Sequence, residues 1–220
     1  MKAVVFANGI LSDPQKSLSY IRPDDILIAA NGGATHCHAL GLTPDVVIGD
    51  FDSLEPGQLE SLKGSGAEII RHPARKDFTD LELALEHAKN IGATQILVMA
   101  ALGNRWDQTL ANLLLPAAKS FSGVDIRLID GPQEILLVKT GQKVVIHGRA
   151  GDVFSLIPLY GDARGITTKG LEYPLENGTL LFGSTRGISN VLVGDTAEIF
   201  LQEGLLIGVL IHLFESTRQN

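Results

Sequence analysis

The feature of this chain that most constrains its fold is a change of pattern near Gly131 and Pro132. Before that point, short runs of almost continuous apolar residues alternate with segments whose apolar residues recur at helical spacing. Strands that are buried on both faces of a parallel sheet have this composition. The alternation predicts a Rossmann-like α/β domain with a mostly parallel sheet over residues 1–130. The expected strands are AVVFAN, DILIAAN, DVVIGD, AEIIRH, QILVMAAL and VDIRLID.

Beyond Pro132 the helical pattern disappears, and short strand-like runs broken by glycine follow one another. Turn signals at nearly regular intervals are typical of an all-β sandwich or barrel, so a second domain is expected over residues 131–220. The most apolar late run, GLLIGVLIHLF, is shorter than the roughly 20 residues needed to cross a bilayer. It is predicted to be a buried terminal strand.

Two helices of the first domain have clear boundary signals. Thr79 and Glu82 make a capping box, so Asp80 is predicted to be the first helical residue, where the helix dipole favours an acid. The later helix is expected to begin at Asp107 as its N-cap. Pro116 lies inside its apolar pattern and should kink or shorten it.

Composition limits the possible partners. The chain has 18 Lys and Arg against 25 Asp and Glu, a net charge of -7 and no basic cluster. Nucleic acid is therefore not expected as a partner, because phosphate backbones are bound by concentrated positive charge. Cys37 is the only cysteine, which excludes an internal disulfide and favours a reducing compartment. Since the N-terminal apolar run is also too short for a signal peptide, we expect a cytoplasmic protein without a membrane partner.

Two acids follow the third expected strand. Asp50 and Asp52 lie two residues apart in the sequence GDFDS, and in an extended chain such residues point to the same face. Both can be explained as caps of a turn and a helix. Two carboxylates on one face nevertheless repel unless a cation lies between them, and Mg²⁺ is typically held by one or two carboxylates together with substrate phosphates. The pattern favours a magnesium site.

Other candidate residues follow the remaining strands. Gly32 and Gly33 allow a tight turn whose amides approach an anion, although a plain turn is the simpler interpretation. Lys76 and Arg105 precede helix starts, where they can meet a phosphate or neutralise neighbouring acids. No Walker or G-x-G-x-x-G sequence occurs. Together these residues predict metal-assisted chemistry on a phosphorylated ligand, with the substrate left open.

Two further features are interpreted as structural. Trp106, the only tryptophan, is expected to pack in the core or to shield the site. His36, Cys37 and His38 are expected to be ordinary helix residues, because adjacent helical positions diverge by about 100° and zinc sites need more ligands at other spacings.

Four segments in order resemble those of the thiamine pyrophosphokinase family: ANGGATHCHALGLTPDVVIGDFDS, KDFTDLELAL, GNRWDQTLANL and GITTKGLEYPLENGTLLFGSTRGISN. The resemblance covers nearly the whole chain. It implies an α/β catalytic domain that binds ATP and Mg²⁺, followed by a β-sandwich domain that binds thiamine. The implied reaction transfers a pyrophosphoryl group from ATP to the hydroxyethyl oxygen of thiamine, yielding thiamine diphosphate and AMP. The implied assembly is a homodimer with sites shared between subunits.

The resemblance also implies roles for individual residues. The expected metal ligands are Asp50, Asp52 and Asp80. The expected nucleotide-binding residues are Asn31, Gly32, Gly33, Lys76, Thr79 and Arg105. The expected catalytic residues are Asp80, Asp107 and Arg105, and either acid is able to activate the thiamine hydroxyl. The residues expected to meet thiamine are Tyr173, Ser189 and Asn190.

Two alternatives remain open at this stage. One is a pyrophosphokinase that acts on another alcohol, such as a hydroxymethyl-pterin, although the complete second domain with its GISN element opposes it. The other is a non-catalytic sensor of thiamine or nucleotide. It is favoured only by Asn31, which stands where the family usually has an aspartate. The chain also departs from the usual pattern at Asn104 and Gln108, where glycine and, in many bacterial members, histidine are common.

Overall fold

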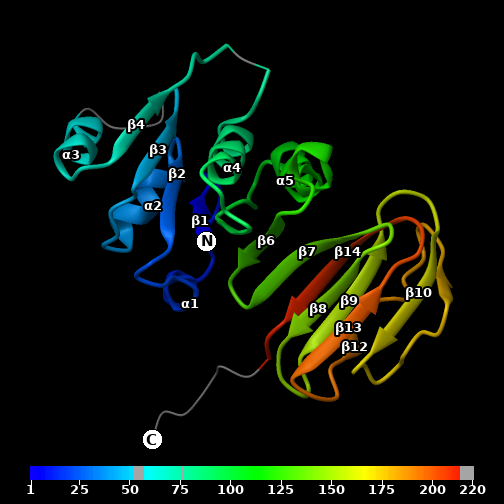
Figure 1. Cartoon of the computed structure of the whole chain (residues 1–220). Helices are drawn as coiled ribbons and strands as arrows, with labels where there is room; N and C mark the ends of the chain where they lie inside the picture. Colours follow the sequence, from blue (N-terminus) through cyan, green and yellow to red (C-terminus); the bar gives the residue numbers. More distant parts are fainter. Residues whose placement is uncertain (52–56, 76, 214–220) are drawn as a thin grey trace, which may run out of the picture. The chain divides into compact units, whose positions relative to one another are not determined.

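The computed structural model describes residues 1–51, 57–75 and 77–213. It divides into two compact units, Met1–Gly131 and Pro132–Asn220 (Figure 1). Each unit has its own hydrophobic core. Asp52 and Lys76 lie outside the described residues.

The first unit contains a parallel sheet with strand order β6-β5-β1-β2-β3-β4. The predicted strands are confirmed: β1 (Lys2–Phe6), β2 (Ile26–Ala30), β3 (Val46–Gly49), β4 (Glu68–Arg71), β5 (Gln95–Met99) and β6 (Asp125–Asp130). The chain runs outward from β1 to β4 and then returns to the other side of β1 for β5. The topological switch point therefore lies between β1 and β5, where ligands of open α/β sheets bind.

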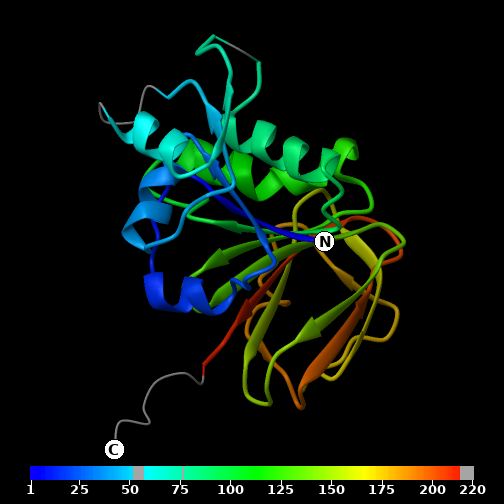
Figure 2. The same ribbon diagram turned by 60° about the vertical axis from the view of Figure 1, so that its left-hand side comes forward.

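Helices cover both faces of this sheet (Figure 1, Figure 2). They are α1 (Pro14–Ser19), α2 (Gly33–Ala39), α3 (Gln58–Gly64), α4 (Asp80–Asn90) and α5 (Trp106–Leu114), with 3₁₀ turns η1 (Leu115–Ala117) and η2 (Lys119–Phe121). Alternate strand residues point to opposite faces. Val4 and Phe6 accordingly pack in one core cluster with Ala34 and Cys37 of α2, together with side chains near α1 and in α3. On the strands' other side, α4 lies against β1, β2 and β3.

The two predicted helix starts fare differently. Thr79 is the N-cap of α4, and its hydroxyl accepts a hydrogen bond from the Glu82 amide at 3.1 Å, as the capping box predicts. The predicted cap of α5 is wrong by two residues, because Arg105 holds the N-cap position and Asp107 lies inside the first turn. Pro116 shortens the helix as expected, since α5 ends at Leu114 and a 3₁₀ turn follows.

The second unit consists of antiparallel strands. One set pairs in the order β12-β9-β14-β7 and the other in the order β11-β10-β13-β8. The strands are β7 (Gln133–Lys139), β8 (Lys143–His147), β9 (Val153–Pro158), β10 (Ala163–Lys169), β11 (Gly178–Leu180), β12 (Asn190–Val191), β13 (Thr196–Phe200) and β14 (Leu205–Ile211). A core that includes Phe154, Ile166 and Leu206 holds them together. The late apolar run forms β14, as predicted.

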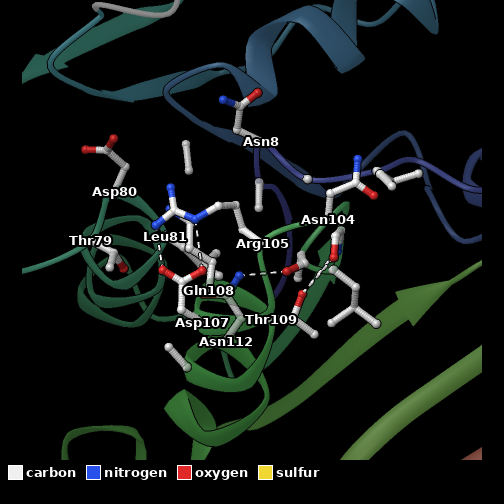
Figure 3. A pocket seen from close by; sticks show the side chains of 18 of the residues that line it. Asn8, Thr79, Asp80, Leu81, Asn104, Arg105, Asp107, Gln108, Thr109 and Asn112 are labelled. Carbon is white, nitrogen blue, oxygen red and sulfur yellow. Dashed lines mark hydrogen bonds and ion pairs between the residues drawn. The ribbon is translucent and has the colours of Figure 1, made fainter.

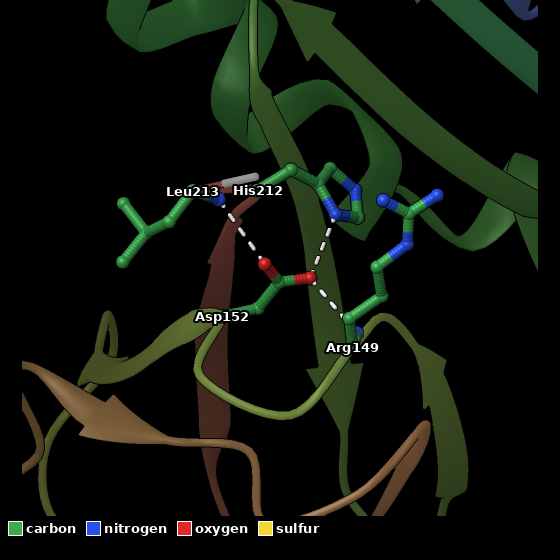
Figure 4. Close-up of polar contacts among 4 residues, drawn as sticks. All are labelled: Arg149, Asp152, His212 and Leu213. Carbon is green, nitrogen blue, oxygen red and sulfur yellow. Dashed lines mark hydrogen bonds and ion pairs between the residues drawn. The ribbon is translucent and has the colours of Figure 1, made fainter. Parts of the chain in front are cut away.

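A buried carboxylate fixes the end of β14 (Figure 4). Asp152 is only 1% exposed and accepts hydrogen bonds from His212 Nδ1 at 3.0 Å and from the amides of Arg149 and Leu213 at 2.9 and 3.1 Å. Burial alone would raise the pKa of Asp152, but the bonds from Leu213, His212 and Arg149 lower it below its ordinary value. The carboxylate therefore ties the end of the last strand to the turn before β9.

Candidate functional site

A cavity of about 720 Å³ opens at the carboxyl ends of β1, β2 and β5 (Figure 3). The register pairs Phe6 of β1 with Met99 of β5, so these two strands end at the same level. The loops that follow them therefore meet at the switch point of the sheet. The lining residues are Ala7, Asn8, Gly9, Ile10, Ala30, Asn31, Thr79, Asp80, Leu81, Ala101, Leu102, Gly103, Asn104, Arg105, Asp107, Gln108, Thr109, Ala111 and Asn112.

The loops after β1 and β5 hold each other by backbone hydrogen bonds. The amides of Gly9 and Ile10 each donate at 2.7 Å, to the carbonyls of Ala100 and Leu102. A Cβ at Gly9 would lie 2.3 Å from the Leu102 carbonyl oxygen, so only glycine fits there. Ala100 has φ 54°, a left-handed conformation that costs energy in a residue with a Cβ. Such strain persists where the surrounding structure imposes it, often at functional sites.

Arg105 and Asp107 form a bidentate ion pair at the cavity wall. Arg105 Nε and Nη2 donate to Asp107 Oδ1 and Oδ2 at 2.9 and 2.5 Å. The hydrogen bond from the guanidinium lowers the pKa of Asp107 to about 2, and the same contact raises the pKa of Arg105. Both side chains are well exposed. An anion can therefore reach the Arg105 guanidinium and compete with Asp107 for its N–H donors.

The start of α4 supplies the acidic side of the cavity. Asp80 and Thr79 line the same space as Arg105 and Asn8, although these residues come from different elements (Figure 3). Asp80 occupies the first position of an eleven-residue helix, where the N-terminal dipole stabilises the charged carboxylate. The cavity thus places a carboxylate and a guanidinium on separate segments around one volume.

The ends of β2 and β3 are joined by side-chain contacts. Asn31, which is 7% exposed, donates from Nδ2 to Asp50 Oδ1 at 3.0 Å. Arg71, at the end of β4, donates to the Asp50 carbonyl at 3.2 Å and lies 5.0 Å from the centre of the Phe51 ring. Asn31 and Phe51 are both left-handed, with φ 48° and 66°. The amide of Asn31 therefore orients the Asp50 carboxylate, and Asn31 itself reaches the cavity lining.

Gly32 and Gly33 have a packing explanation. Both are buried, and neither is among the described residues that line the cavity. A Cβ at Gly33 would lie 2.0 Å from the Phe6 carbonyl oxygen, and one at Gly32 would meet the Asn8 side chain at 2.3 Å. These glycines let the start of α2 pack directly on the end of β1. The structure gives them this role and adds no support for the predicted contact with an anion.

The second unit has a smaller cavity of about 320 Å³. Most of its described lining residues are apolar, and Thr168, Tyr173, Arg186 and Asn190 add polar groups. The residues are Phe154, Leu156, Thr168, Leu171, Tyr173, Pro174, Leu175, Leu180, Arg186, Gly187 and Asn190. Asn190 Oδ1 accepts from the Tyr173 amide at 3.1 Å, and its Nδ2 donates to the Tyr173 carbonyl at 2.8 Å. Asn190 therefore fixes the backbone that carries Tyr173.

Ser189 lies beside this cavity and is not one of its lining residues in the described part of the unit. Its φ is 61°, and its amide donates to Ser155 Oγ at 3.0 Å. The left-handed backbone of Ser189, fixed by the bond to the Ser155 hydroxyl, turns the chain so that Asn190 reaches Tyr173. Two of the three predicted thiamine contacts, Tyr173 and Asn190, are thus brought together around the cavity, and Ser189 shapes the turn between them.

Other expectations meet mixed outcomes. Trp106 is 74% exposed, so packing in the core is wrong for it. Cys37 is buried in the first core and His38 is exposed, as ordinary helix residues are. Asn8 was not singled out from the sequence. The rule that polar residues after parallel strands gather at one edge, applied to the first strand, would have found it.

The described residues contain neither a metal-binding cluster nor a membrane-spanning helix. Within residues 1–51, 57–75 and 77–213, no three His, Cys, Asp or Glu side chains are grouped so that they hold a metal ion. The predicted ligand set cannot be complete there, because Asp52 lies outside these ranges. In the same part of the chain, no helix is long and apolar enough to cross a membrane.

Comparisons with known proteins agree with the division into two units. The family model "Thiamin pyrophosphokinase, catalytic domain" matches residues 18–128, and "Thiamin pyrophosphokinase, vitamin B1 binding domain" matches residues 141–206. Thiamine pyrophosphokinase of Bacillus subtilis is 29% identical over 188 residues, which are 86% of this chain and 88% of that protein. Thiamine pyrophosphokinase 1 of Oryza sativa subsp. japonica is 30% identical over 172 residues, 74% of this chain and 64% of the relative.

The crystal structure of the thiamine pyrophosphokinase from Bacillus subtilis is also similar in fold. It superposes with a TM-score of 0.84 at 26% identity, covering 96% of this chain and 99% of that one. The combination of a parallel sheet with flanking helices and a unit of antiparallel strands is therefore shared with a solved structure of known family.

Proposed function

Because the chain belongs to the thiamine pyrophosphokinase family and carries both of its domains, it pyrophosphorylates thiamine with ATP, and we propose that the two cavities described above, one in each unit, divide this task. The larger cavity binds ATP and carries the reacting groups, and the smaller one binds the rings of thiamine. One observation carries the proposal: each of the two units contains a described cavity, lined by charged and amide side chains in the first unit and mainly by apolar side chains in the second. Thiamine diphosphate and AMP are the products.

The larger cavity suits a nucleotide in three respects. Its volume of about 720 Å³ falls within the usual range for small-molecule sites. It lies at the switch point of a parallel sheet, where nucleotides bind in many open α/β folds. Its wall also carries the Arg105 guanidinium, whose planar fork matches phosphate oxygens. We assign Arg105, Thr79 and Asn31 to the nucleotide; Lys76, Gly32 and Gly33 stay in that proposal on the family resemblance alone.

Phosphoryl transfer depends mainly on positioning and on neutralising charge at the transferred group. When ATP phosphates engage Arg105, the guanidinium leaves Asp107 or shares its donors with it. The pKa of Asp107 then rises from about 2, since its hydrogen bond to Arg105 is the largest cause of that low value. Where Arg105 shares its donors between the phosphates and Asp107, Asp107 remains a poor proton acceptor. We therefore assign the orienting or deprotonation of the thiamine hydroxyl to Asp80, at the start of α4.

The donor chemistry of this site fits Mg²⁺. The ion prefers oxygen ligands and usually takes one or two carboxylates with substrate phosphates. Asp50 and Asp80 supply such oxygens, Asn31 orients the first of them at 3.0 Å, and Asp52 is the third proposed ligand. Bound there, Mg²⁺ neutralises phosphate charge. The chain's own contribution is to hold the Asp50 carboxylate after the end of β3 and the Asp80 carboxylate at the start of α4.

The smaller cavity suits the rings of thiamine. Apolar walls that include Phe154, Leu171 and Leu180 bury aromatic surface, and Tyr173 offers a ring face to the positive thiazolium. Asn190 acts by holding Tyr173, and Ser189 acts by setting the turn before Asn190. The match of the vitamin B1 binding domain, which spans this whole lining, supports the assignment.

The same proposal includes the character of the two domains and the assembly of the protein. We describe residues 1–130 as a Rossmann-like catalytic domain and residues 131–220 as a β-sandwich thiamine-binding domain, which the strand orders support. A cytoplasmic homodimer is inferred from the family resemblance. Trp106, Leu110 and Leu114 support the dimer, since they recur every four residues on α5 and are 74%, 55% and 47% exposed.

The two alternative functions are not favoured. An acceptor other than thiamine does not explain why the second unit matches a vitamin B1 binding domain. A sensor without catalysis was favoured only by Asn31, and its amide is engaged in orienting the Asp50 carboxylate. The substitution of the usual aspartate is thus compatible with a working site.

The reaction is tested by measuring AMP from the purified protein with MgATP, with and without thiamine, and by identifying the product. AMP and thiamine diphosphate should appear together, and only when thiamine is present. Thiamine binding without AMP formation would instead establish the sensor, and Asn31→Asp would then be the next variant to test.

A further inference from the structure

His36 makes a contact that its position in the sequence does not predict. It lies on α2, beyond the buried start of that helix, and its Nε2 is 2.9 Å from the carbonyl oxygen of Gly9. Gly9 belongs to the loop after β1 and lines the larger cavity. A side chain that was expected to be an ordinary helix residue therefore reaches across to the wall of the proposed nucleotide site.

The contact completes the fixation of that wall. On one side, the amides of Gly9 and Ile10 donate to the carbonyls of Ala100 and Leu102. These bonds fix the N–H groups of the loop, whereas the Gly9 carbonyl is fixed by His36. Since a peptide unit is planar, holding the Gly9 carbonyl also sets the orientation of the following amide. The segment from Asn8 to Ile10 is thus held from α2 as well as from the loop after β5.

The bond to the Gly9 carbonyl requires a hydrogen on Nε2 of His36. A carbonyl oxygen only accepts, so Nε2 must carry a hydrogen, either in the neutral Nε2–H tautomer or in the imidazolium. His38, two residues further along the same helix, is exposed. Two histidines on one helix therefore lie in different environments, and only His36 contacts a residue of the cavity lining in the part of the chain that the structure describes.

We propose that His36 is a positioning residue for nucleotide binding: through its bond to the Gly9 carbonyl it holds the segment from Asn8 to Ile10 in the shape that receives ATP. The proposal rests on the assignment of the larger cavity to the nucleotide. It concerns ATP only, because the cavity assigned to thiamine lies in the other unit. His36 acts through Gly9 and is not a catalytic residue.

The test compares variants that differ in where they place an N–H donor. Glutamine carries its amide nitrogen at about the reach of Nε2, whereas the amide of asparagine is shorter. His36→Ala and His36→Asn should raise the KM for ATP about three- to tenfold, the effect of losing one hydrogen bond. The KM for thiamine should stay unchanged. His36→Gln should restore the KM for ATP to within about twofold of the parent value, and His38→Ala is the matched control.

Two direct readouts separate this proposal from the assigned reaction. Imidazole ¹⁵N shifts should show a hydrogen on Nε2 of His36, and calorimetry with a non-hydrolysable ATP analogue should repeat the order of the KM values. Both work even if the parent protein forms no AMP, which would count against the reaction alone. An Nε2 of His36 without a hydrogen would overturn the proposal, and so would equal ATP affinity in His36→Ala and the parent. An equal rise of the KM for ATP and the KM for thiamine in His36→Ala would also overturn it.

Discussion

The two cavities described above, one in each unit, are built in different ways. The larger one is made by loops that follow parallel strands, and the order of those strands brings the loops to one edge whatever their sequences are. The smaller one is made by residues of β9, β10, β11 and β12 and by the connections on either side of β11. The strand order of a parallel sheet therefore predicts where its site lies. In an antiparallel unit, the position of the site depends on the particular side chains.

The chemistry of the cavities differs in the same sense. Charged and amide side chains, among them Asp80, Arg105 and Asn31, line the larger cavity, and apolar side chains predominate in the smaller one. The first suits phosphates and the second suits rings. If this division holds, substitutions in one cavity should change turnover or ATP binding, and substitutions in the other should change the KM for thiamine alone.

The largest effect is expected for Asp80→Asn. We expect kcat to fall about 100-fold or more, the usual contribution of an acid–base group. The helix start should lose at most about 1 kcal/mol of dipole stabilisation, so the protein should remain folded by circular dichroism. Glu86→Gln, on the same helix and outside the described cavity lining, is the control. A kcat of Asp80→Asn within twofold of the parent would remove Asp80 from the mechanism.

A smaller loss is expected for Arg105→Ala. Losing a charged hydrogen-bond donor to phosphate should lower kcat/KM for ATP about 10- to 100-fold. Asp107 should titrate at a higher pH in this variant, because its hydrogen bond to Arg105 is the largest cause of its pKa of about 2. Carboxyl ¹³C shifts measured against pH check this directly. Arg22→Ala, an exposed arginine of the same unit, is the control, and an unchanged Asp107 titration would contradict the ion pair.

Tyr173→Ala sharpens the comparison from the other unit. Loss of an aromatic contact should raise the KM for thiamine about two- to tenfold and leave the KM for ATP unchanged. Tyr160, which is 81% exposed and is not among the described residues of the cavity lining, provides the matched control Tyr160→Ala. An equal rise in both KM values for Tyr173→Ala would break the division between the cavities.

Asp152→Asn should destabilise the fold, and of the four substitutions it should change the activity least. We expect a loss of about 2 kcal/mol in the unfolding free energy at pH 7, since a buried carboxylate with three hydrogen bonds loses its charge. The folded pKa of Asp152 is lowered, so its contribution is present above the unfolded pKa of about 4 and is lost as pH falls towards the folded value.

Urea unfolding of the parent and Asp152→Asn, from pH 7 down to pH about 3, measures this difference. The difference in unfolding free energy between the parent and Asp152→Asn should become smaller only below pH about 4. A difference that is constant over the whole pH range would show that the charge of Asp152 does not stabilise the fold. A changed KM for thiamine at pH 7 would show that this carboxylate also supports the cavity.

Much of the fold follows from the sequence pattern. Continuous apolar runs predicted β1 to β6, because a strand buried on both faces needs apolar residues at every position. The capping box predicted the start of α4 because Thr79 and Glu82 act within four residues of each other. Such local or strictly periodic signals do not depend on knowledge of the partners in space.

The errors concern residues whose environment depends on distant segments. Packing of Trp106 in the core is wrong, because the helical period of α5 does not reveal which segments pack against that helix. Gly32 and Gly33 pack against the end of β1 and the Asn8 side chain, which the sequence does not reveal, and their contact with an anion stays a prediction. The contact of His36 with Gly9 joins residues 27 positions apart, and no spacing rule links them.

The division of labour between the cavities is tested most directly by amide hydrogen exchange with each substrate added separately. MgATP should slow exchange in peptides that contain residues 7–10 and 101–112, and thiamine should slow exchange in peptides that contain Tyr173 and Asn190. Thiamine that leaves these last peptides unchanged and protects only the loops after β1 and β5 would contradict the account.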